Sequence, residues 1–361
     1  MYKIFAINLG STSTKVAYYE DDQMILKKTI QHAKEDINAC SGIFDQYDFR
    51  RRDIENFMKE NGINNEEIDA FVSRGGTTQP LHSGTYRIDE DMLEEVRGGK
   101  YGFHPCSLGC QIAKDMANSH ALPLTVDLPG TCDYNPLAFY SGMPEIIRTP
   151  AHQALNARAM AQKYAEDIGR PYEELNLLVS VLGGGTTVTA HEKGKLVDGQ
   201  NGVVGDGAFS NNRCNAVPVG ELVDMCYSGK YTYEQMKRKI NGESGLLGYL
   251  GEMDTIDIER KALAGDKKYA EVLGAMCYQI AKDIGAYATV LNGKVDAILL
   301  IGGMANSAYI TGMIKERVEF IAPVVVMPGE REMESLCLNA YKALTGQIEI
   351  KSFEEGKVLH V

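Results

Sequence analysis

The sequence lacks several features that would assign a function class directly. It has no run of Lys and Arg longer than three residues, and its formal net charge is −12. Because contacts to nucleic-acid phosphates need clustered basic side chains, duplex nucleic acid is not an expected partner. The net negative charge of the protein would repel an anionic nucleotide. Such a ligand would therefore have to be held locally, by glycine turns, individual arginines and Mg²⁺.

Long apolar runs and paired cysteine motifs are missing as well. No stretch reaches the length that spans a bilayer, and no basic segment followed by an apolar run opens the chain, so neither membrane association nor secretion is expected. The eight cysteines form no CxxC pair and no zinc-like array. We therefore expect reduced thiols and a cytoplasmic protein.

The common nucleotide-binding signatures are absent too. The sequence contains no GxxxxGK[ST] motif, no protein-kinase HRD and DFG pair, and no GxGxxG fingerprint. A dinucleotide-binding function therefore loses its main support, and a phosphate site would have to be built from other turns.

What the sequence does contain is an internal repeat. Residues 4–17, a strand, a glycine turn and a second strand, align without gaps to residues 178–191, which places Gly10 on Gly184. Residues 68–76 match residues 295–303 in the same order. Because 361 residues suit two domains, the repeat predicts a duplicated α/β protein. Two such turns facing one another across a cleft would clamp a polyphosphate.

The expected domain boundaries follow from helix signals. Helix 151–169 ends at a Gly-Arg-Pro sequence, which gives a first domain of residues 1–170 and a second of residues 171–330. A last helix begins at 331, and the segment 331–361 is expected to return to the first domain. The apolar spacing of residues 268–291 predicts a further long helix.

Polar and glycine-rich turns supply the phosphate-site candidates. The first turn contains Gly10 and four hydroxyl residues between Asn8 and Lys15. Glycine can take a positive φ there, and successive amides form a concavity that suits an anion, although a plain hairpin turn is the ordinary alternative. Three glycines at 183–185 end an apolar strand, which indicates either phosphate contact or a tight structural turn. Gly302 and Gly303 open a helix, as in a nucleotide site or a plain strand–helix turn.

Charged residues in loops and at element ends supply the remaining candidates. Arg74 and Arg213 lie in Gly- or Asn-rich loops, where arginine can bind a phosphate or carboxylate through two parallel hydrogen bonds, or simply be solvated. Asp127 ends a buried strand, a usual place for an active-site carboxylate and also for a turn cap. Three further candidate residues lie at predicted helix starts: His152, Glu332 and Glu334. At a helix start the helix dipole stabilises a carboxylate and makes a histidine less basic, so a purely structural role is the alternative.

Taken together and in order, segments along nearly the whole chain resemble butyrate kinase, which belongs with acetate kinase in the sugar kinase/Hsp70/actin superfamily. The resemblance implies two duplicated actin-like (ribonuclease H-like) domains around an interdomain nucleotide cleft. It also implies ATP-dependent phosphorylation of a short-chain carboxylate with Mg²⁺. The segments that carry it are residues 8–15, 182–185, 190–191, 218–223, 227–231, 278–282, 320–324 and 328–330.

The resemblance assigns a role to each candidate. Asn8 and the first turn would meet the transferred phosphoryl group, and Arg74 and Arg213 would hold the acyl carboxylate and stabilise the transferring charge. Asp127 would organise Mg²⁺, with Glu334 or, in second place, Glu332. The residues implied to bind the ATP or ADP are Gly10, Ser11, Thr12, Ser13, Thr14, Lys15, Gly183, Gly184, Gly185, Thr186, Gly302, Gly303, Met304, Ala305 and Asn306.

The departures from the family pattern concern mainly the acyl side. Gln153 stands where the family has a histidine expected to donate to the phosphoryl group in flight, and His152 is one residue early. Glutamine can donate a hydrogen bond but carries no charge, so we predict a paralogue with an altered acid substrate or altered activity. The other departures are Leu9, Ser107, Asp206, Asn215 and Ala216, in place of Pro, Asn, Glu, Gly and Gly.

The first hypothesis is therefore reversible phosphoryl transfer from ATP to a carboxylate, giving an acyl phosphate and ADP. Its expected metabolic partner is an acyl-phosphate/CoA transferase, and its expected assembly is a homodimer or larger homo-oligomer. One alternative is a kinase for a different acid or a hydroxyl substrate. Another is a nucleotide-binding paralogue without carboxylate kinase activity.

Overall fold

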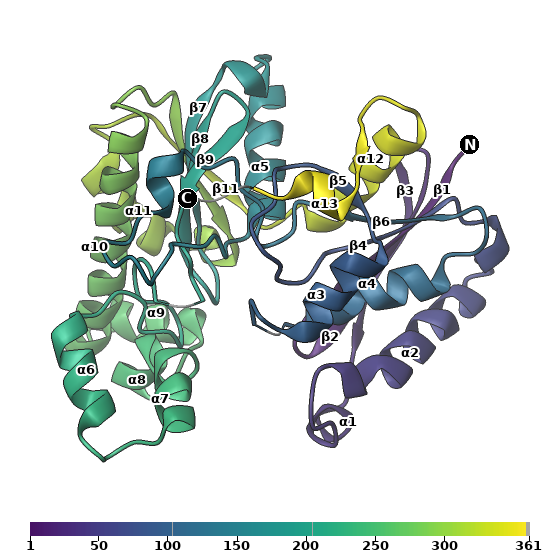
Figure 1. Ribbon diagram of the computed structural model, residues 1–361. Helices are drawn as coiled ribbons and strands as arrows, with labels where there is room; N and C mark the ends of the chain where they lie inside the picture. Colours follow the sequence, from purple (N-terminus) through teal and green to yellow (C-terminus); the bar gives the residue numbers. More distant parts are fainter. Residues whose placement is uncertain (103, 204, 359–361) are drawn as a thin grey trace. The chain divides into compact units, whose positions relative to one another are not determined.

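The structure is a computed structural model that describes residues 1–102, 104–203 and 205–358. The chain divides into two compact units, each built on one β-sheet (Figure 1). The first unit comprises Met1–Cys132, Ala154–Asn156 and the described residues from Arg331 onward. The second comprises Asp133–Gln153 and Ala157–Glu330.

A seven-stranded mixed sheet forms the first unit. Its strands are β1 (Lys3–Leu9), β2 (Ser13–Glu20), β3 (Gln23–Gln31), β4 (Ala70–Ser73), β5 (Thr85–Arg87), β6 (Leu122–Val126) and β12 (Ile350–Lys351). The spatial order is β12-β5-β6-β4-β1-β2-β3. Strands β1 to β3 form an antiparallel meander, whereas β4 is parallel to both β1 and β6.

Helices cover both faces of this sheet because its strands are apolar on both sides. The helices are α1 (Lys34–Asn38), α2 (Tyr47–Glu60), α3 (Glu90–Gly98), α4 (Pro105–Met116), α12 (Glu332–Leu344) and α13 (Phe353–Gly356). Phe5 and Ile7 of β1 pack in the core with α2, α3 and α4, whereas Ile4 and Ala6 pack with α12. Figure 1 shows α12 on the opposite side of the sheet from α2 and α4. Alternate residues of a strand point to opposite faces, so each face is committed to its own helices.

The second unit repeats the central arrangement of the first. Its five strands are β7 (Asn176–Val181), β8 (Thr187–Glu192), β9 (Lys195–Gly199), β10 (Ala297–Gly302) and β11 (Val324–Pro328). The order β11-β10-β7-β8-β9, with an antiparallel meander and two parallel strands, matches β6-β4-β1-β2-β3. The duplicated α/β fold predicted from the sequence repeat is therefore confirmed.

Helices again lie on both faces of the second sheet. They are α5 (Ala154–Asp167), α10 (Lys267–Val290) and α11 (Ala308–Val318), with α6 (Val219–Tyr227), α7 (Tyr233–Ile240), α8 (Gly245–Leu250) and α9 (Thr255–Leu263) between β9 and α10. Leu178 packs with α10 and α11, whereas Leu177 packs with α5. The long helix expected at 268–291 is α10. Helix α5 belongs to the second unit except for Ala154–Asn156, whereas the sequence boundary was placed at 170.

Two further expectations concern cysteines and membranes. All eight cysteines are unpaired, as their scattered spacing indicated. Within the described residues, no helix has both the length and the apolar character that crossing a membrane requires.

Candidate active site

The turn between β1 and β2 is the first candidate phosphate-binding segment. The Gly10 amide donates to the Ser13 carbonyl at 2.8 Å. Gly10 does not take the positive φ that the sequence suggested, and a Cβ there would make only an ordinary van der Waals contact, 3.4 Å from the Ser13 carbonyl oxygen. Ser11 and Thr12 are exposed, whereas Thr14 is fully buried. The exposed part of the turn is therefore short.

The pleat of β2 separates the polar residues of this turn onto two faces. Asn8 is directly opposite Lys15 in the β1–β2 pair, so their side chains share one face. Thr14 points to the other face, where its hydroxyl lies 2.8 Å from His32 Nε2 and 3.2 Å from Arg50 Nη1. The side chain of Thr14 is thus part of the support beneath the turn.

A buried glutamate at the start of α12 links two predicted catalytic residues. Asn8 Nδ2 donates to Glu332 Oε2 at 2.7 Å, and Arg74 Nη1 lies 3.3 Å from Glu332 Oε1. Glu334, ranked before Glu332 from the sequence, forms an ion pair with Arg331, with Arg331 Nε 2.6 Å from Oε2. The structure therefore brings Asn8, Arg74 and Glu332 together.

Asp127 follows β6 in an unusual backbone conformation. Its φ is 40°, its Oδ1 accepts from the Gly84 amide at 3.0 Å, and its own amide donates to the Gly84 carbonyl at 3.1 Å. A left-handed aspartate is uncommon, and such residues gather at functional sites.

The carboxylates of the first unit have donor chemistry that suits Mg²⁺. No group of three or more His, Cys, Asp or Glu side chains among the described residues is arranged to hold a metal. Mg²⁺, however, usually takes only one or two protein carboxylates and fills its other positions with water and substrate phosphates. Asp127, Glu332 and Glu334 each offer carboxylate oxygens of the kind that Mg²⁺ prefers.

In the second unit, the glycine turn after β7 packs against Arg213. A Cβ at Gly185 would lie 2.6 Å from Arg213 Nη1, so a larger residue there would displace the guanidinium. Nη1 donates to the Gly202 carbonyl at 2.6 Å, and the buried Nε has no hydrogen-bond partner among the described residues. Burial lowers the pKa of Arg213. A partly buried guanidinium beside bare backbone has the donor chemistry of an anion site.

The second glycine pair lies directly beside this turn. Gly302 has a φ of 90°, and a Cβ there would lie 2.4 Å from the Leu182 carbonyl oxygen. The same carbonyl accepts from the Met304 amide at 3.1 Å, where the 3₁₀ helix η5 (Gly303–Asn306) begins. The structure thus brings the predicted segments 183–186 and 302–306 together.

Gln153 joins helix α5 to the glycine turn. It is the N-cap residue of α5, its Nε2 donates to the Gly185 carbonyl at 3.2 Å, and its Oε1 accepts from Thr187 Oγ1 at 2.8 Å. His152 is buried beside Tyr134, with ring centroids 6.2 Å apart. Within the described part of the chain, neither of its ring nitrogens has a hydrogen-bond partner. Of the two adjacent residues, Gln153 makes the contacts to the glycine turn.

We expect His152 to make the protein less stable in mild acid. Burial lowers the pKa of His152 to about 4, against about 6.5 in an unfolded chain. As pH falls, the unfolded chain binds the proton first, so the free energy of unfolding decreases through this window. The loss attributable to His152 between pH 7 and pH 5 is about 2 kcal/mol. Urea unfolding of His152→Gln at both pH values should show a smaller difference than the native protein. The exposed His120→Gln is the control, and an unchanged difference in His152→Gln would contradict the assignment.

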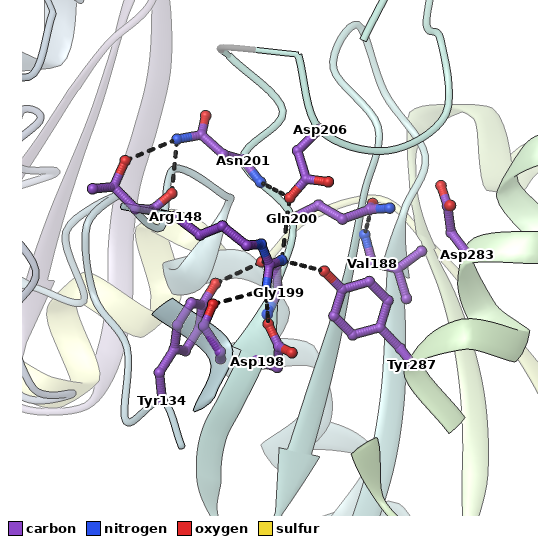
Figure 2. Close-up of polar contacts among 12 residues, drawn as sticks. Tyr134, Arg148, Val188, Asp198, Gly199, Gln200, Asn201, Asp206, Asp283 and Tyr287 are labelled. Carbon is purple, nitrogen blue, oxygen red and sulfur yellow. Dashed lines mark hydrogen bonds and ion pairs between the residues drawn. The ribbon is translucent and has the colours of Figure 1, made fainter. Parts of the chain in front are cut away.

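Arg148 organises the loop that contains the departure Asp206. Figure 2 shows its guanidinium among Asp198, Asp206 and Tyr287. Its Nη1 lies 3.3 Å from Asp198 Oδ1, and its Nη2 lies 3.3 Å from Asp206 Oδ2 and 3.1 Å from the Tyr287 hydroxyl. Burial raises the pKa of Asp198, and the charge of Arg148 opposes that shift. The network holds Asp198 and Asp206, which lie on either side of Gly202, the residue whose carbonyl accepts from Arg213.

Two arginines that organise these segments were not predicted from the sequence. Arg50 is fully buried on α2, and Arg148 lies in the Pro- and Gly-rich segment before α5. A usable signal existed for Arg50, because it shares a helical face with Ile54, Phe57 and Met58, all buried. No comparable periodicity marks Arg148.

Known proteins resemble this chain over most of its length. A model of the acetokinase family matches residues 147–326. The chain is 40% identical to butyrate kinase 2 of Clostridium acetobutylicum over 98% of its own length and 99% of that protein. It is 41% identical to butyrate kinase 1 of the same organism, over 98% and 100% of the two chains.

Solved structures show the same fold at lower identity. The acetate kinase of Porphyromonas gingivalis superposes with a TM-score of 0.77 at 18% identity, covering 96% of this chain and 100% of that one. A propionate kinase from Francisella tularensis gives 0.75 at 17% identity, with coverage of 94% and 99%. The actin-like fold is therefore confirmed. Its near full-length similarity to the two clostridial proteins shows that this chain belongs to the acetokinase family.

Proposed function

We propose that this chain phosphorylates a short-chain carboxylate with ATP, reversibly, giving an acyl phosphate and ADP. The butyrate kinase relatives support the reaction class and make a four-carbon acid the first substrate to test. The observation that carries the proposal is Arg213, whose partly buried guanidinium lies against the glycine turn and whose buried Nε has no hydrogen-bond partner among the described residues. Such a group suits an anionic substrate that it must bind and release.

Phosphoryl transfer to a carboxylate needs stabilisation of negative charge more than it needs proton transfer. A carboxylate oxygen forms a bond to the γ-phosphorus, the bond to the β–γ bridging oxygen breaks, and ADP leaves with that electron pair. With a pKa of about 4, the acid is already ionised, so no general base is needed. Arg213 and Arg74 would hold the acyl carboxylate and stabilise charge on the equatorial oxygens, and Asn8 would donate to the phosphoryl group.

The nucleotide would be held by the second unit. The glycines at 183–185 and Thr186 would bind the β- and γ-phosphates through backbone amides, and residues 302–306 would lie on the adenosine side. Mg²⁺, when bound, neutralises phosphate charge. Asp127 would hold it with Glu334 or Glu332. Of these two glutamates, Glu332 has the support of contacts to Asn8 and Arg74.

A panel of C2–C6 acids in a coupled ADP-release assay tests this proposal. Trapping the product with hydroxylamine identifies an acyl phosphate, because phosphate esters do not react. Release of ADP without a trapped hydroxamate would point to a hydroxyl substrate. Nucleotide binding in calorimetry without ADP release on any acid would instead indicate a paralogue that binds nucleotide and lacks this activity.

Gln153 has its own expected effect on this reaction. Gln153→Ala leaves the Gly185 carbonyl and the Thr187 hydroxyl without their partner, which costs about 1–3 kcal/mol at a buried site. We expect a fall in kcat/KM for ATP of about 10-fold, measured with the best acid of the panel. Gln153→His keeps one ring donor and should retain more activity than Gln153→Ala. Equal activity in all three proteins would show that the contacts of Gln153 do not matter to catalysis.

Three wider proposals follow from the same resemblance. The protein is proposed to be cytoplasmic and to exchange its acyl phosphate with an acyl-phosphate/CoA transferase. It is also proposed to form a homodimer or larger homo-oligomer, supported by the exposed apolar side chains on helix α6, such as Val219 and Tyr227. Light scattering coupled to size-exclusion chromatography tests the assembly.

A further inference from the structure

Arg50 lies beneath the β1–β2 turn and binds its backbone. Its side chain is fully buried on α2. Nη2 donates to the Gly10 carbonyl at 3.0 Å and to the Ser11 carbonyl at 3.2 Å, and Nη1 donates to the Ser13 carbonyl at 3.2 Å. One guanidinium therefore holds three carbonyls on the same side of the turn.

Holding these carbonyls also orients the amides of the turn. In a trans peptide, the carbonyl of one residue and the N–H of the next point in opposite directions. Because the Gly10 and Ser11 carbonyls face Arg50, the amides of Ser11 and Thr12 point away from it. Among the described residues, neither amide has a backbone hydrogen-bond partner. Arg50 thus aims two amide donors at the exposed side, the arrangement that binds anions.

Thr14, His32 and Asp53 extend this network. Arginine has donors only, so Thr14 Oγ1 accepts from Arg50 at 3.2 Å and gives its own proton to His32 Nε2 at 2.8 Å. His32 Nδ1 then donates to Asp53 Oδ2 at 3.1 Å. The His32 amide donates to the Thr12 carbonyl at 3.1 Å. Every carbonyl from position 10 to position 13 is therefore held.

The network requires a neutral His32. Burial, followed by the charge of Arg50, lowers the pKa of His32, while Asp53 and Asp36 act in the opposite direction. A protonated His32 would have to donate to Thr14 Oγ1, leaving the Thr14 proton without its acceptor. Because Thr14 is fully buried, its hydroxyl serves the network and is not placed to react with a substrate.

We propose that Arg50, His32 and Asp53 are positioning residues for phosphoryl transfer, holding the β1–β2 turn so that its amides bind the transferred phosphoryl group. The inference rests on the proposed function, because it takes the terminal phosphate of ATP as the anion that this turn meets. Arg50 also places a buried positive charge beneath the turn without touching the ligand. Donors fixed before the reaction need no reorganisation as charge develops.

Arg50→Lys is the sharpest test, since it keeps the charge and replaces the planar fork with a single ammonium. We expect kcat to fall about 10²-fold through misplacement of the turn, with the KM of the acid changed by less than about 2-fold. In calorimetry, the preference for AMP-PNP over ADP should shrink while the affinity for ADP is retained. Arg51→Lys, whose partners are Glu55 and Tyr47, is the matched control and should behave as the native protein.

Asp53→Asn provides a milder second variant, because Asp53 is only partly buried. It should lower kcat and the AMP-PNP preference in the same direction. The inference is overturned if a folded Arg50→Lys variant has the native kcat and the native preference for AMP-PNP. If Arg50→Lys does not fold, native values of both quantities in Asp53→Asn overturn it. Absence of ADP release by the native protein would instead count against the proposed function, and the AMP-PNP comparison would still report on the turn.

Discussion

Replacing Arg213 with glutamine should lower kcat for ADP release by about 10²–10³-fold, the cost of losing one group that stabilises transition-state charge. Stability should move the other way. Burial already lowers the pKa of Arg213, and its Nε has no partner among the described residues, so the charge is held in the fold at a cost. The melting temperature of Arg213→Gln is therefore expected to be unchanged or higher.

The opposite signs make this test specific. Kinetic constants and thermal melting should be measured on the same preparations of Arg213→Gln, with Arg260→Gln as the control, since Arg260 is exposed and paired with Asp257 on α9. A variant that loses activity only in proportion to lost stability would show that Arg213 is structural. Retention of native kcat would remove Arg213 from the proposed mechanism altogether.

Replacing Gly302 with alanine should destabilise the second unit by about 3 kcal/mol. Its φ of 90° and ψ of −178° lie in a region that is essentially reserved for glycine. An added Cβ would also lie 2.4 Å from the Leu182 carbonyl oxygen, which belongs to rigid backbone. Relief would require the glycine turn after β7 to move, so nucleotide affinity should fall together with stability.

The adjacent glycine supplies a matched control. A Cβ at Gly303 meets no described atom within 4 Å, so Gly303→Ala should unfold like the native protein. Urea unfolding followed by circular dichroism is the suitable measurement, because the chain has no tryptophan. Equal urea midpoints of unfolding for the two alanine variants would show that the contact between Gly302 and the Leu182 carbonyl does not affect stability.

The sequence predicted the duplicated architecture because each repeat carries its own local signals. The glycine turn and the apolar strands recur in both halves, so the two halves were expected to share one kind of fold. The candidate residues of the second unit could be selected from the sequence, since Gly185, Arg213 and Gly302 all lie in turns where their residue type is informative. For Gly302 the structure adds the reason, a positive φ beside a carbonyl.

Side-chain direction was the part that the sequence could not give. Thr14 and Ser13 are neighbours in one polar run, yet the pleat sends Thr14 to the buried face with Arg50. Glu332 and Glu334 are two positions apart on a helix, which turns them to different partners. In such cases the residue types agree with a site, and only the path of the backbone decides which side chain reaches it.

The return of the chain from Arg331 into the first unit affects how the protein is made. Helix α12 covers the face of the first sheet formed by Ile4 and Ala6. On the ribosome, that face emerges early, and its covering helix is synthesised only after all of residues 157–330. The apolar face of the first sheet therefore stays exposed until α12 has been synthesised, which is after the residues that form the core of the second unit. Nascent chains stalled before residue 331 should accordingly bind chaperones through their N-terminal half.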